Sequence, residues 1–162
     1  MSYLRVWDQE AAARADQFIA ISNFIKEKIG KYYGRDSGVI YPPVDTKKFS
    51  SGRQPNETGD YFLMVGRMVP YKKFDLAVQS FNELGYPLKI IGDGPEKKKL
   101  EKIAKKNIEF LGLISDYKLP SYYRGAKAVV FPQEEDFGIV PVEAMSAGKP
   151  VIAYRAGGTL ET

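Results

Sequence analysis

Two glutamates, Glu135 and Glu143, lie eight residues apart in the segment EEDFGIVPVEAMSAGKPVIAY. Paired carboxylates can serve as general acid and base on a glycosidic bond, or they can accept hydrogen bonds from sugar hydroxyls. Between them, Gly138, Ile139 and Val140 open an expected helix, whose free amides and positive dipole end could bind a phosphate. Taken alone, this helix start is more typical of an ordinary αβ unit. The pattern gains weight only with other groups.

A pair of cations follows an earlier apolar run. Arg67 and Lys72 lie five positions apart in GRMVPYKK, directly after FLMV and Gly66. Arginine offers a planar fork to phosphate oxygens, and lysine offers a point charge. A solvated basic loop is the alternative. The place after a strand favours a ligand site, because parallel α/β sheets bind ligands beyond the carboxyl ends of their strands. Carboxylates, cations and helix amides together suit a sugar nucleotide.

The glycine-rich segment IGDGPEKKKL, residues 91–100, is a weaker candidate. Its spacing matches neither the dinucleotide fingerprint nor the P-loop. Asp93 and Pro95 are expected to form a turn and a helix entry. The lysines from Lys97 to Lys106 predict a solvated helix face, because no aromatic residues alternate with them as base stacking would require.

The composition narrows the possible chemistry. The 162 residues include no cysteine and no histidine, which excludes disulfides, thiolate nucleophiles and the commonest general base within this chain. No apolar run approaches the roughly 18 residues of a membrane span, and no signal-peptide pattern opens the chain. A cytoplasmic protein is therefore expected. The formal charge of +4 favours anionic partners: a nucleic acid, a membrane surface or a phosphorylated ligand.

Strand-like and helix-like segments alternate five times from Tyr61 onward. The strand-like runs are FLMVG, LKIIG, IEFLG, AVVFP and PVIAY. This alternation predicts an α/β fold, a Rossmann-like parallel sheet with helices on both faces. The intervening helices are expected at about residues 74–84, 95–106, 116–125 and 139–147.

The first 50 residues resemble the tail of another α/β unit. A helical run through AAARAD is followed by a strand in DQFIAIS, a helix from Asn23 to about Tyr33 and a strand in GVIYP. Residues 51–60 are polar and contain glycine, as a linker or exposed loop would. Three parts are therefore expected: residues 1–50, a linker at 51–60, and a second domain at 61–162.

Five segments in chain order resemble the retaining family-4 glycosyltransferases of the GT-B fold, in particular the mannosyltransferase-like members. They are AISNFIKEKI with VIYPPVDTKKF, VGRMVPYKKFDLAV, IGDGPEKKKL, IEFLGLISDYKLPSYYRGA and EEDFGIVPVEAMSAGKPVIAYRAGGTLE. The pair of glutamates with seven residues between them is the most discriminating part. The resemblance implies two Rossmann-like domains. Residues 1–50 would end the acceptor domain, and 61–162 would form most of the donor domain, truncated at its C-terminus.

The resemblance also implies roles for individual residues. Arg67 and Lys72 would bind the diphosphate and stabilise its leaving charge, and Glu135 would contact the transferred sugar. These three are the implied catalytic residues. Glu143 would hold the ribose hydroxyls, and the backbone near Ile114 would border the nucleobase. The complete implied donor-binding set is Gly66, Arg67, Lys72, Ile114, Glu135, Phe137, Gly138, Ile139, Val140 and Glu143.

The implied reaction transfers a hexose, with GDP-mannose as the favoured donor, to a glycan or lipid-linked acceptor in polysaccharide biosynthesis. The anomeric configuration would be retained through a front-face transfer in which the leaving phosphate helps to deprotonate the acceptor. No metal and no cofactor are expected, because cations and helix amides can neutralise the leaving diphosphate. Tyr71 departs from the family, which often has a small or acidic residue before the lysine. Lys73 beside Lys72 leaves open which lysine binds the phosphate.

The sequence leaves other functions open. The chain could be a non-catalytic nucleotide-sugar or anion-binding module, inactive in transfer by itself. Its basic helix could also contact the inner face of a membrane peripherally. Nucleic-acid binding is favoured by charge alone, and it is not the expected function.

Overall fold

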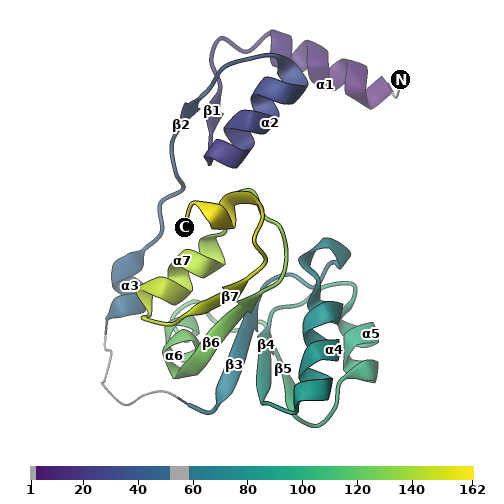
Figure 1. The fold of residues 1–162 in the computed structure, drawn as a ribbon, viewed down its shortest axis with the longest axis vertical. Coiled ribbons are helices and arrows are strands. Elements are labelled where there is room, and N and C mark those ends of the chain that lie inside the picture. The colour runs from purple at the N-terminus through teal and green to yellow at the C-terminus, as the bar shows by residue number, and fades with distance from the viewer. Residues whose placement is uncertain (1–2, 52–58) are drawn as a thin grey trace.

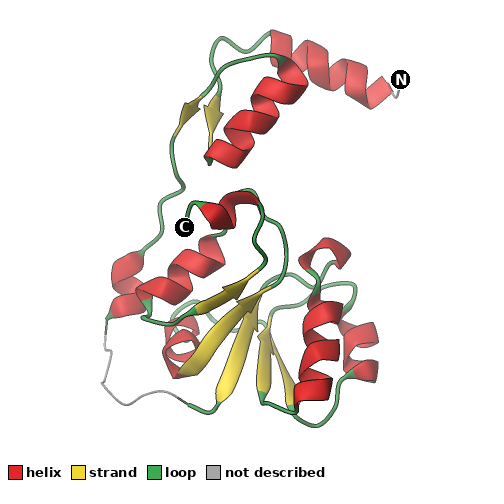
Figure 2. Ribbon diagram, viewed as in Figure 1, coloured by secondary structure: helices red, strands yellow, loops and turns green. Residues whose placement is uncertain are grey.

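The structure is a computed structural model that describes residues 3–51 and 59–162. Its larger part is a parallel five-stranded sheet with helices on both faces (Figure 1, Figure 2). The strand order is β5-β4-β3-β6-β7, and every neighbouring pair runs parallel. The predicted α/β sheet is thus confirmed. The strands are β3 (Tyr61–Val65), β4 (Leu88–Ile91), β5 (Ile108–Gly112), β6 (Ala126–Phe131) and β7 (Val151–Ala153).

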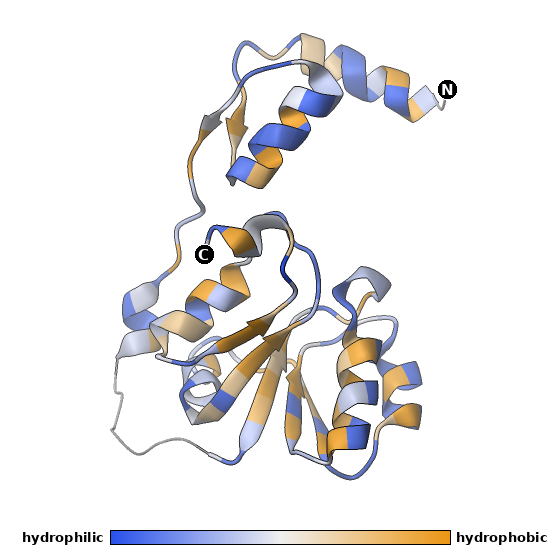
Figure 3. Cartoon of the chain, viewed as in Figure 1, coloured by the Kyte–Doolittle hydropathy of each residue, from blue (hydrophilic) through white to orange (hydrophobic). Residues whose placement is uncertain are grey.

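Both faces of the central strands are covered, and successive residues of these strands alternate between two cores. Met64 lies in the first core and Leu63 in the second, and Val130 and Val129 divide in the same way. Because strand side chains point alternately to opposite faces, a strand covered on both sides needs apolar residues at nearly every position. This explains the mainly apolar strands, in which Lys89, Glu109 and Lys127 are the charged residues. Strand β6 is coloured as mainly hydrophobic in Figure 3.

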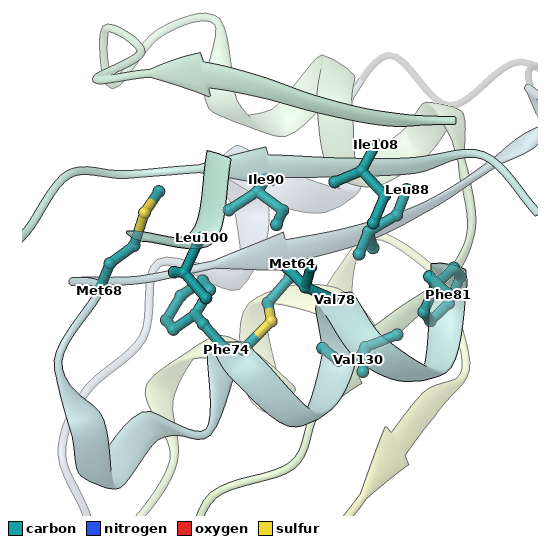
Figure 4. Packing of buried hydrophobic residues seen from close by; sticks show 11 residues of the cluster. Met64, Met68, Phe74, Val78, Phe81, Leu88, Ile90, Leu100, Ile108 and Val130 are labelled. Atoms are coloured by element: carbon teal, nitrogen blue, oxygen red, sulfur yellow. The ribbon is translucent and has the colours of Figure 1, made fainter. Parts of the chain in front are cut away.

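Helices α4 and α5 cover one face of the sheet, and α3, α6 and α7 cover the other. Figure 4 shows the first core, which gathers Phe74 and Phe81 of α4 with Met64 of β3 and Leu100 of α5. Helix α4 has its predicted bounds, whereas α5, α6 and α7 are shorter than predicted by five, three and one residues. None of the helices in the described ranges is both long and apolar enough to cross a membrane. The bounds are α3 (Thr46–Ser50), α4 (Phe74–Leu84), α5 (Lys97–Ile103), α6 (Leu119–Gly125) and α7 (Ile139–Ser146).

A smaller N-terminal unit lies beyond the carboxyl ends of the sheet strands (Figure 1). Its two short strands pair in parallel, and helix α2 has its predicted bounds. Ser22 caps that helix by accepting a hydrogen bond from the amide of Ile25 at 3.1 Å. The elements are α1 (Tyr3–Ala13), β1 (Ile19–Ala20), α2 (Asn23–Tyr33) and β2 (Gly38–Val39).

The predicted linker at residues 51–60 falls largely on 52–58, which lie outside the described residues. Before that gap, Phe49 of α3 is buried against Tyr123 of α6, with ring centroids 5.3 Å apart. After the gap, the amide of Gly59 donates a hydrogen bond to the carbonyl of Gly125 at 2.7 Å. The division of the chain at this linker stays a prediction.

Candidate functional site

The order of the strands defines the place where a site is expected. The chain builds β3, β4 and β5 outward in one direction and then returns to place β6 on the other side of β3. Such a reversal brings the loops that follow the two adjacent strands together and opens a crevice at the carboxyl edge of the sheet. Here the loop after β3 carries the cations Arg67 and Lys72, and the loop after β6 carries the carboxylate of Glu135.

Lys72 and Glu135 meet at this reversal point. Lys72 ends a short 3-10 helix, η1 (Pro70–Lys72), after β3, and its Nζ lies 3.2 Å from Oε1 of Glu135 in the loop after β6. Both side chains are mostly buried, with 20% and 23% of their surfaces exposed. The Oε1 atom is shielded from water and accepts no hydrogen bond within the described residues. Its charge is compensated by Lys72, while its capacity to accept a hydrogen bond is unused.

A cavity of about 300 Å³ surrounds this ion pair. Ile21 of the N-terminal unit and Pro42, in the segment after β2, contribute to its lining. Helix α7 begins at the cavity, and its first amides have no acceptor within the helix, while Pro141 in the first turn has no amide to satisfy. The cavity therefore combines a cation, a carboxylate and free amide donors. The predicted site residues on its lining are Lys72, Glu135, Phe137, Gly138, Ile139 and Val140.

A second cavity, of about 520 Å³, lies between the loops that follow β3, β4 and β5. Arg67 on its lining is exposed, and no carboxylate in the described residues pairs with it. Arg67 and Lys72 thus border different cavities along one edge of the sheet. The sequence predicts a turn at Asp93 and Pro95, and the structure shows that residues 92–94 also line this cavity. Their place after β4 was the signal for this position. The lining is Val65, Gly66, Arg67, Ile91, Gly92, Asp93, Gly94, Leu113, Ile114 and Leu119.

Glu143 lies on α7, one turn beyond Val140, and is held by a buried tyrosine. The hydroxyl of Tyr123 donates a hydrogen bond to Oε2 of Glu143 at 2.6 Å. Burial raises the pKa of Glu143 above its usual value, although the Tyr123 hydrogen bond and the ammonium of Lys48 act to lower it. Burial likewise raises the pKa of Tyr123, so this phenol stays protonated and remains a donor.

The loop after β6 is supported from two sides by residues that the sequence interpretation had missed. The amide of Gly158 donates to the carbonyl of Glu135 at 2.8 Å, and a Cβ added at Gly158 would come within 2.4 Å of Phe137 Cα. From the other side, the Ser22 hydroxyl donates to the carbonyl of Asp136. These contacts hold the backbone of the loop that carries Glu135.

Residues 45–162 match the family model described as "Glycosyl transferases group 1". The chain belongs to this family. The family membership and the fold both agree with the resemblance of the sequence to GT-B glycosyltransferases.

Relatives of this glycosyltransferase chain include two curated proteins. An uncharacterised glycosyltransferase of Methanocaldococcus jannaschii, MJ1178, is 35% identical over 95% of this chain and 44% of its own length. The O-antigen chain mannosyltransferase RfbU of Salmonella typhimurium is 31% identical over 93% of this chain and 45% of its own length. The chain therefore spans less than half the length of these relatives.

Solved glycosyltransferase structures share the fold. The Anabaena protein HepE, solved in complex with UDP and glucose, superposes with a TM-score of 0.84 and 25% identity, covering 98% of this chain and 49% of HepE. WaaG, a glycosyltransferase of lipopolysaccharide biosynthesis, superposes with a TM-score of 0.74 and 20% identity, covering 88% of this chain and 45% of WaaG. The ligand roles of individual residues in this chain stay predictions.

Proposed function

We propose that the chain is the donor-binding part of a retaining hexosyltransferase that uses a nucleoside-diphosphate sugar. The observation that carries this proposal is the meeting of Lys72 and Glu135 at the strand reversal, 3.2 Å apart, beside the first amides of α7. One cavity thereby offers positive groups for a phosphate and a carboxylate for sugar hydroxyls. A sugar nucleotide carries both kinds of group in one molecule.

In this proposal the donor extends along the carboxyl edge of the sheet. The nucleobase occupies the larger cavity beside Ile114, whose lining is mainly apolar, with Arg67 and Gly66 near the diphosphate. Glu143 binds the ribose hydroxyls. The transferred sugar lies in the smaller cavity, where Glu135 accepts hydrogen bonds from its hydroxyls.

The transfer itself follows from the charges around the diphosphate. The bond between the sugar C1 and the diphosphate oxygen breaks while the acceptor hydroxyl oxygen bonds to C1 from the same face. The acceptor proton passes to a leaving phosphate oxygen. The charge on the departing diphosphate is stabilised by Arg67, Lys72 and the amides at Gly138 to Val140. This electrostatic contribution is on the order of several kcal/mol. No side chain of this chain is required to act as nucleophile.

Mannose is the favoured sugar and GDP the favoured nucleotide. RfbU is named a mannosyltransferase, and a Mycolicibacterium smegmatis relative that is 27% identical over 91% of this chain is named a GDP-mannose-dependent mannosyltransferase. HepE was solved with UDP and glucose. This supports a nucleotide-sugar donor, although the base in HepE is uracil and not guanine. The proposed acceptor is a glycan or a lipid-linked acceptor.

The proposal extends to a cytoplasmic protein in peripheral contact with the inner face of the membrane. The exposed lysines of the α5 region, among them Lys98, Lys102 and Lys106, could approach anionic headgroups. Cosedimentation with vesicles containing phosphatidylglycerol tests this contact, which should weaken as the salt concentration rises. Equal binding to neutral vesicles would contradict an electrostatic contact.

A non-catalytic nucleotide-sugar or anion-binding module is the second candidate. Both cavities, and all the residues proposed to bind the donor, lie within this chain, which spans less than half the length of its relatives. Binding without transfer by this chain alone is therefore a distinct outcome. Incubation with a radiolabelled donor and candidate acceptors separates the two, because only the transferase makes a labelled glycan.

Titration calorimetry tests the binding step that both candidates share. The chain is titrated with GDP, UDP and ADP and with their sugar conjugates, and the tightest nucleotide identifies the base. We expect saturable binding with one site per chain. Absence of binding to every nucleoside diphosphate would overturn the proposal. Salt-dependent binding to unrelated DNA that free nucleoside diphosphate does not displace would indicate a nucleic-acid binder instead.

A further inference from the structure

The side chain of Tyr123 is fixed where three helices meet. It lies on α6 with no exposed surface, and the ring of Phe49 from α3 packs edge-on against it at an interplanar angle of 87°. Both rings belong to the second core. Because the ring cannot rotate away, its hydroxyl has a fixed position and direction, toward Glu143 on α7 (Figure 1 shows the three helices together).

The hydrogen bond from Tyr123 uses only one oxygen of Glu143. Oε2 accepts it at 2.6 Å, a length typical of a charge-assisted bond. The other oxygen, Oε1, accepts no hydrogen bond from the described part of the chain, and the side chain of Glu143 is only partly buried. A carboxylate with one oxygen held and the other free has a defined direction in which to accept a ligand hydroxyl.

The charges around Glu143 come from two further elements. Lys48 of α3 acts to lower the pKa of Glu143, whereas Asp116, in the loop before α6, acts to raise it. Lys48 and Asp116 are themselves paired, with Nζ and Oδ2 2.5 Å apart. Against burial, which raises the pKa, Tyr123 and Lys48 favour the ionised carboxylate. The ionised form accepts hydrogen bonds at both oxygens.

We propose that Tyr123 is a positioning residue that holds Glu143 for the ribose and so gives the site its preference for ribonucleotides. This inference rests on the proposed function, because it presupposes that Glu143 faces the ribose of a bound nucleotide. It adds a specificity role for a buried side chain that touches no ligand. The hydroxyl acts only through Glu143.

The test compares each nucleotide with its analogue that lacks both ribose hydroxyls. GDP is used, or UDP or ADP if that nucleotide binds more tightly, together with the 2′,3′-dideoxy form. We expect the parent chain to prefer the ribonucleotide by about tenfold or more, since a bound nucleotide without ribose hydroxyls would cover the Glu143 carboxylate and leave it without a hydrogen-bond partner. Tyr123→Phe keeps the ring packing. It should weaken ribonucleotide binding about fivefold and change dideoxynucleotide binding by less than about twofold.

A neighbouring residue provides a matched control. Tyr122→Phe removes a hydroxyl from the same helix, and the hydrogen bond that the backbone carbonyl of Tyr122 accepts from the Tyr61 hydroxyl is left in place. This variant should bind both nucleotides like the parent. In addition, Glu143→Gln should abolish most of the ribose preference, and adding Tyr123→Phe to it should cost no further ribonucleotide affinity. Coupling of this kind identifies two residues that act as a unit.

A pH profile separates positioning from a merely structural role. The ribose preference should disappear as the pH falls through the pKa of Glu143, because a protonated carboxyl loses an acceptor. Tyr123→Phe removes a hydrogen bond that lowers the pKa of Glu143. The Tyr123→Phe variant should therefore lose its ribose preference at a higher pH than the parent. Lys48→Met should shift the profile in the same direction.

The possible outcomes distinguish a failure of the positioning role of Tyr123 from a failure of the proposed function. Equal losses for the ribonucleotide and dideoxynucleotide in Tyr123→Phe, or additive losses with Glu143→Gln, would overturn the positioning role alone. A Glu143→Gln variant that keeps the full ribose preference would overturn the ribose contact as well. A parent chain that binds no nucleoside diphosphate would overturn the proposed function, and the inference with it.

Discussion

The carboxylate of Glu161 binds the start of helix α2 at Asn23. Its Oε2 accepts hydrogen bonds from the backbone amide and the side-chain amide of Asn23, both at 2.8 Å, and Oε1 accepts one from the amide of Phe24 at 2.9 Å. The hydroxyl of Tyr41 adds a fourth at 3.0 Å. The negative charge of Glu161 therefore lies at the positive end of α2, where its oxygens pair with amides that have no acceptor within the helix. The contact joins the N-terminal unit to the segment after β7.

Glu161→Gln is expected to lower the free energy of unfolding by about 1–2 kcal/mol at neutral pH, because charge-assisted hydrogen bonds are stronger than neutral ones. Urea denaturation measures this change. Glu27→Gln on the exposed face of α2 is the control and should be close to neutral, because the Glu27 carboxylate has no hydrogen bond or ion pair within the described residues. A loss for Glu27→Gln as large as that for Glu161→Gln would contradict a specific contact.

The same contact predicts a pH dependence. Desolvation alone would raise the pKa of Glu161, but the hydrogen bonds from Asn23, Phe24 and Tyr41 together hold this pKa below its ordinary 4.5. The stability that the carboxylate contributes is therefore present above about 4.5 and is lost as the pH falls through the lowered folded-state pKa. The difference between the parent and Glu161→Gln should accordingly shrink in acid. A difference that grows as the pH falls would be inconsistent with this sign.

Local signals made part of the fold predictable from sequence. Helix α2 begins after a serine cap and ends at Gly34, and α4 ends at Gly85, so both sets of bounds were predicted. The strands were predicted from their short, mainly apolar runs. Helix α3 (Thr46–Ser50) was missed, since five residues are too few to show a helical period.

The long-range contacts of the site carried no such signal. Lys72 and Glu135 were each singled out by type and position, but their ion pair depends on β6 pairing with β3, which no local pattern specifies. In the sequence, Gly158 indicates only a turn and Ser22 only a helix cap. Their contacts with the loop after β6 join segments more than 20 and more than 110 residues apart, so only the folded chain shows them.

Arg67→Ala and Lys72→Ala should each weaken nucleoside diphosphate binding about tenfold or more, because each removes a charge-assisted phosphate contact. The loss should be larger for Lys72→Ala, since that change also leaves the carboxylate of Glu135 without its cation in a mostly buried place. Titration calorimetry with the preferred nucleotide measures both.

Lys73→Gln is the control for this pair and decides between the two adjacent lysines. Lys73 is exposed and has no ion pair with a carboxylate in the described part of the chain. Its loss should change affinity by less than about twofold, apart from a small long-range charge effect. Parent-like binding by Arg67→Ala and Lys72→Ala, or a greater loss with Lys73→Gln, would refute the assignment of the phosphate ligands.

Nucleotide binding should not require a divalent metal, because Arg67, Lys72 and the first amides of α7 supply positive groups around the diphosphate. The dissociation constant in EDTA and in magnesium chloride, at matched ionic strength, is expected to agree within about twofold. Affinity that falls tenfold or more in EDTA would show that a metal ion completes the site.

Gly138→Ala should damage both stability and phosphate binding. Gly138 has a φ of +99°, in the region that side chains disfavour, and a Cβ there would lie 3.3 Å from Cγ of Pro141. The strain should cost about 1–3 kcal/mol, and relieving it would turn the first amides of α7 away from the cavity. Gly34→Ala is the matched control, with a φ of +63° and open space around the added Cβ. It should lose some stability yet bind nucleoside diphosphate like the parent. If Gly138→Ala, measured by urea denaturation and by calorimetry, loses no more affinity than Gly34→Ala, then the amides that follow Gly138 do not bind the diphosphate.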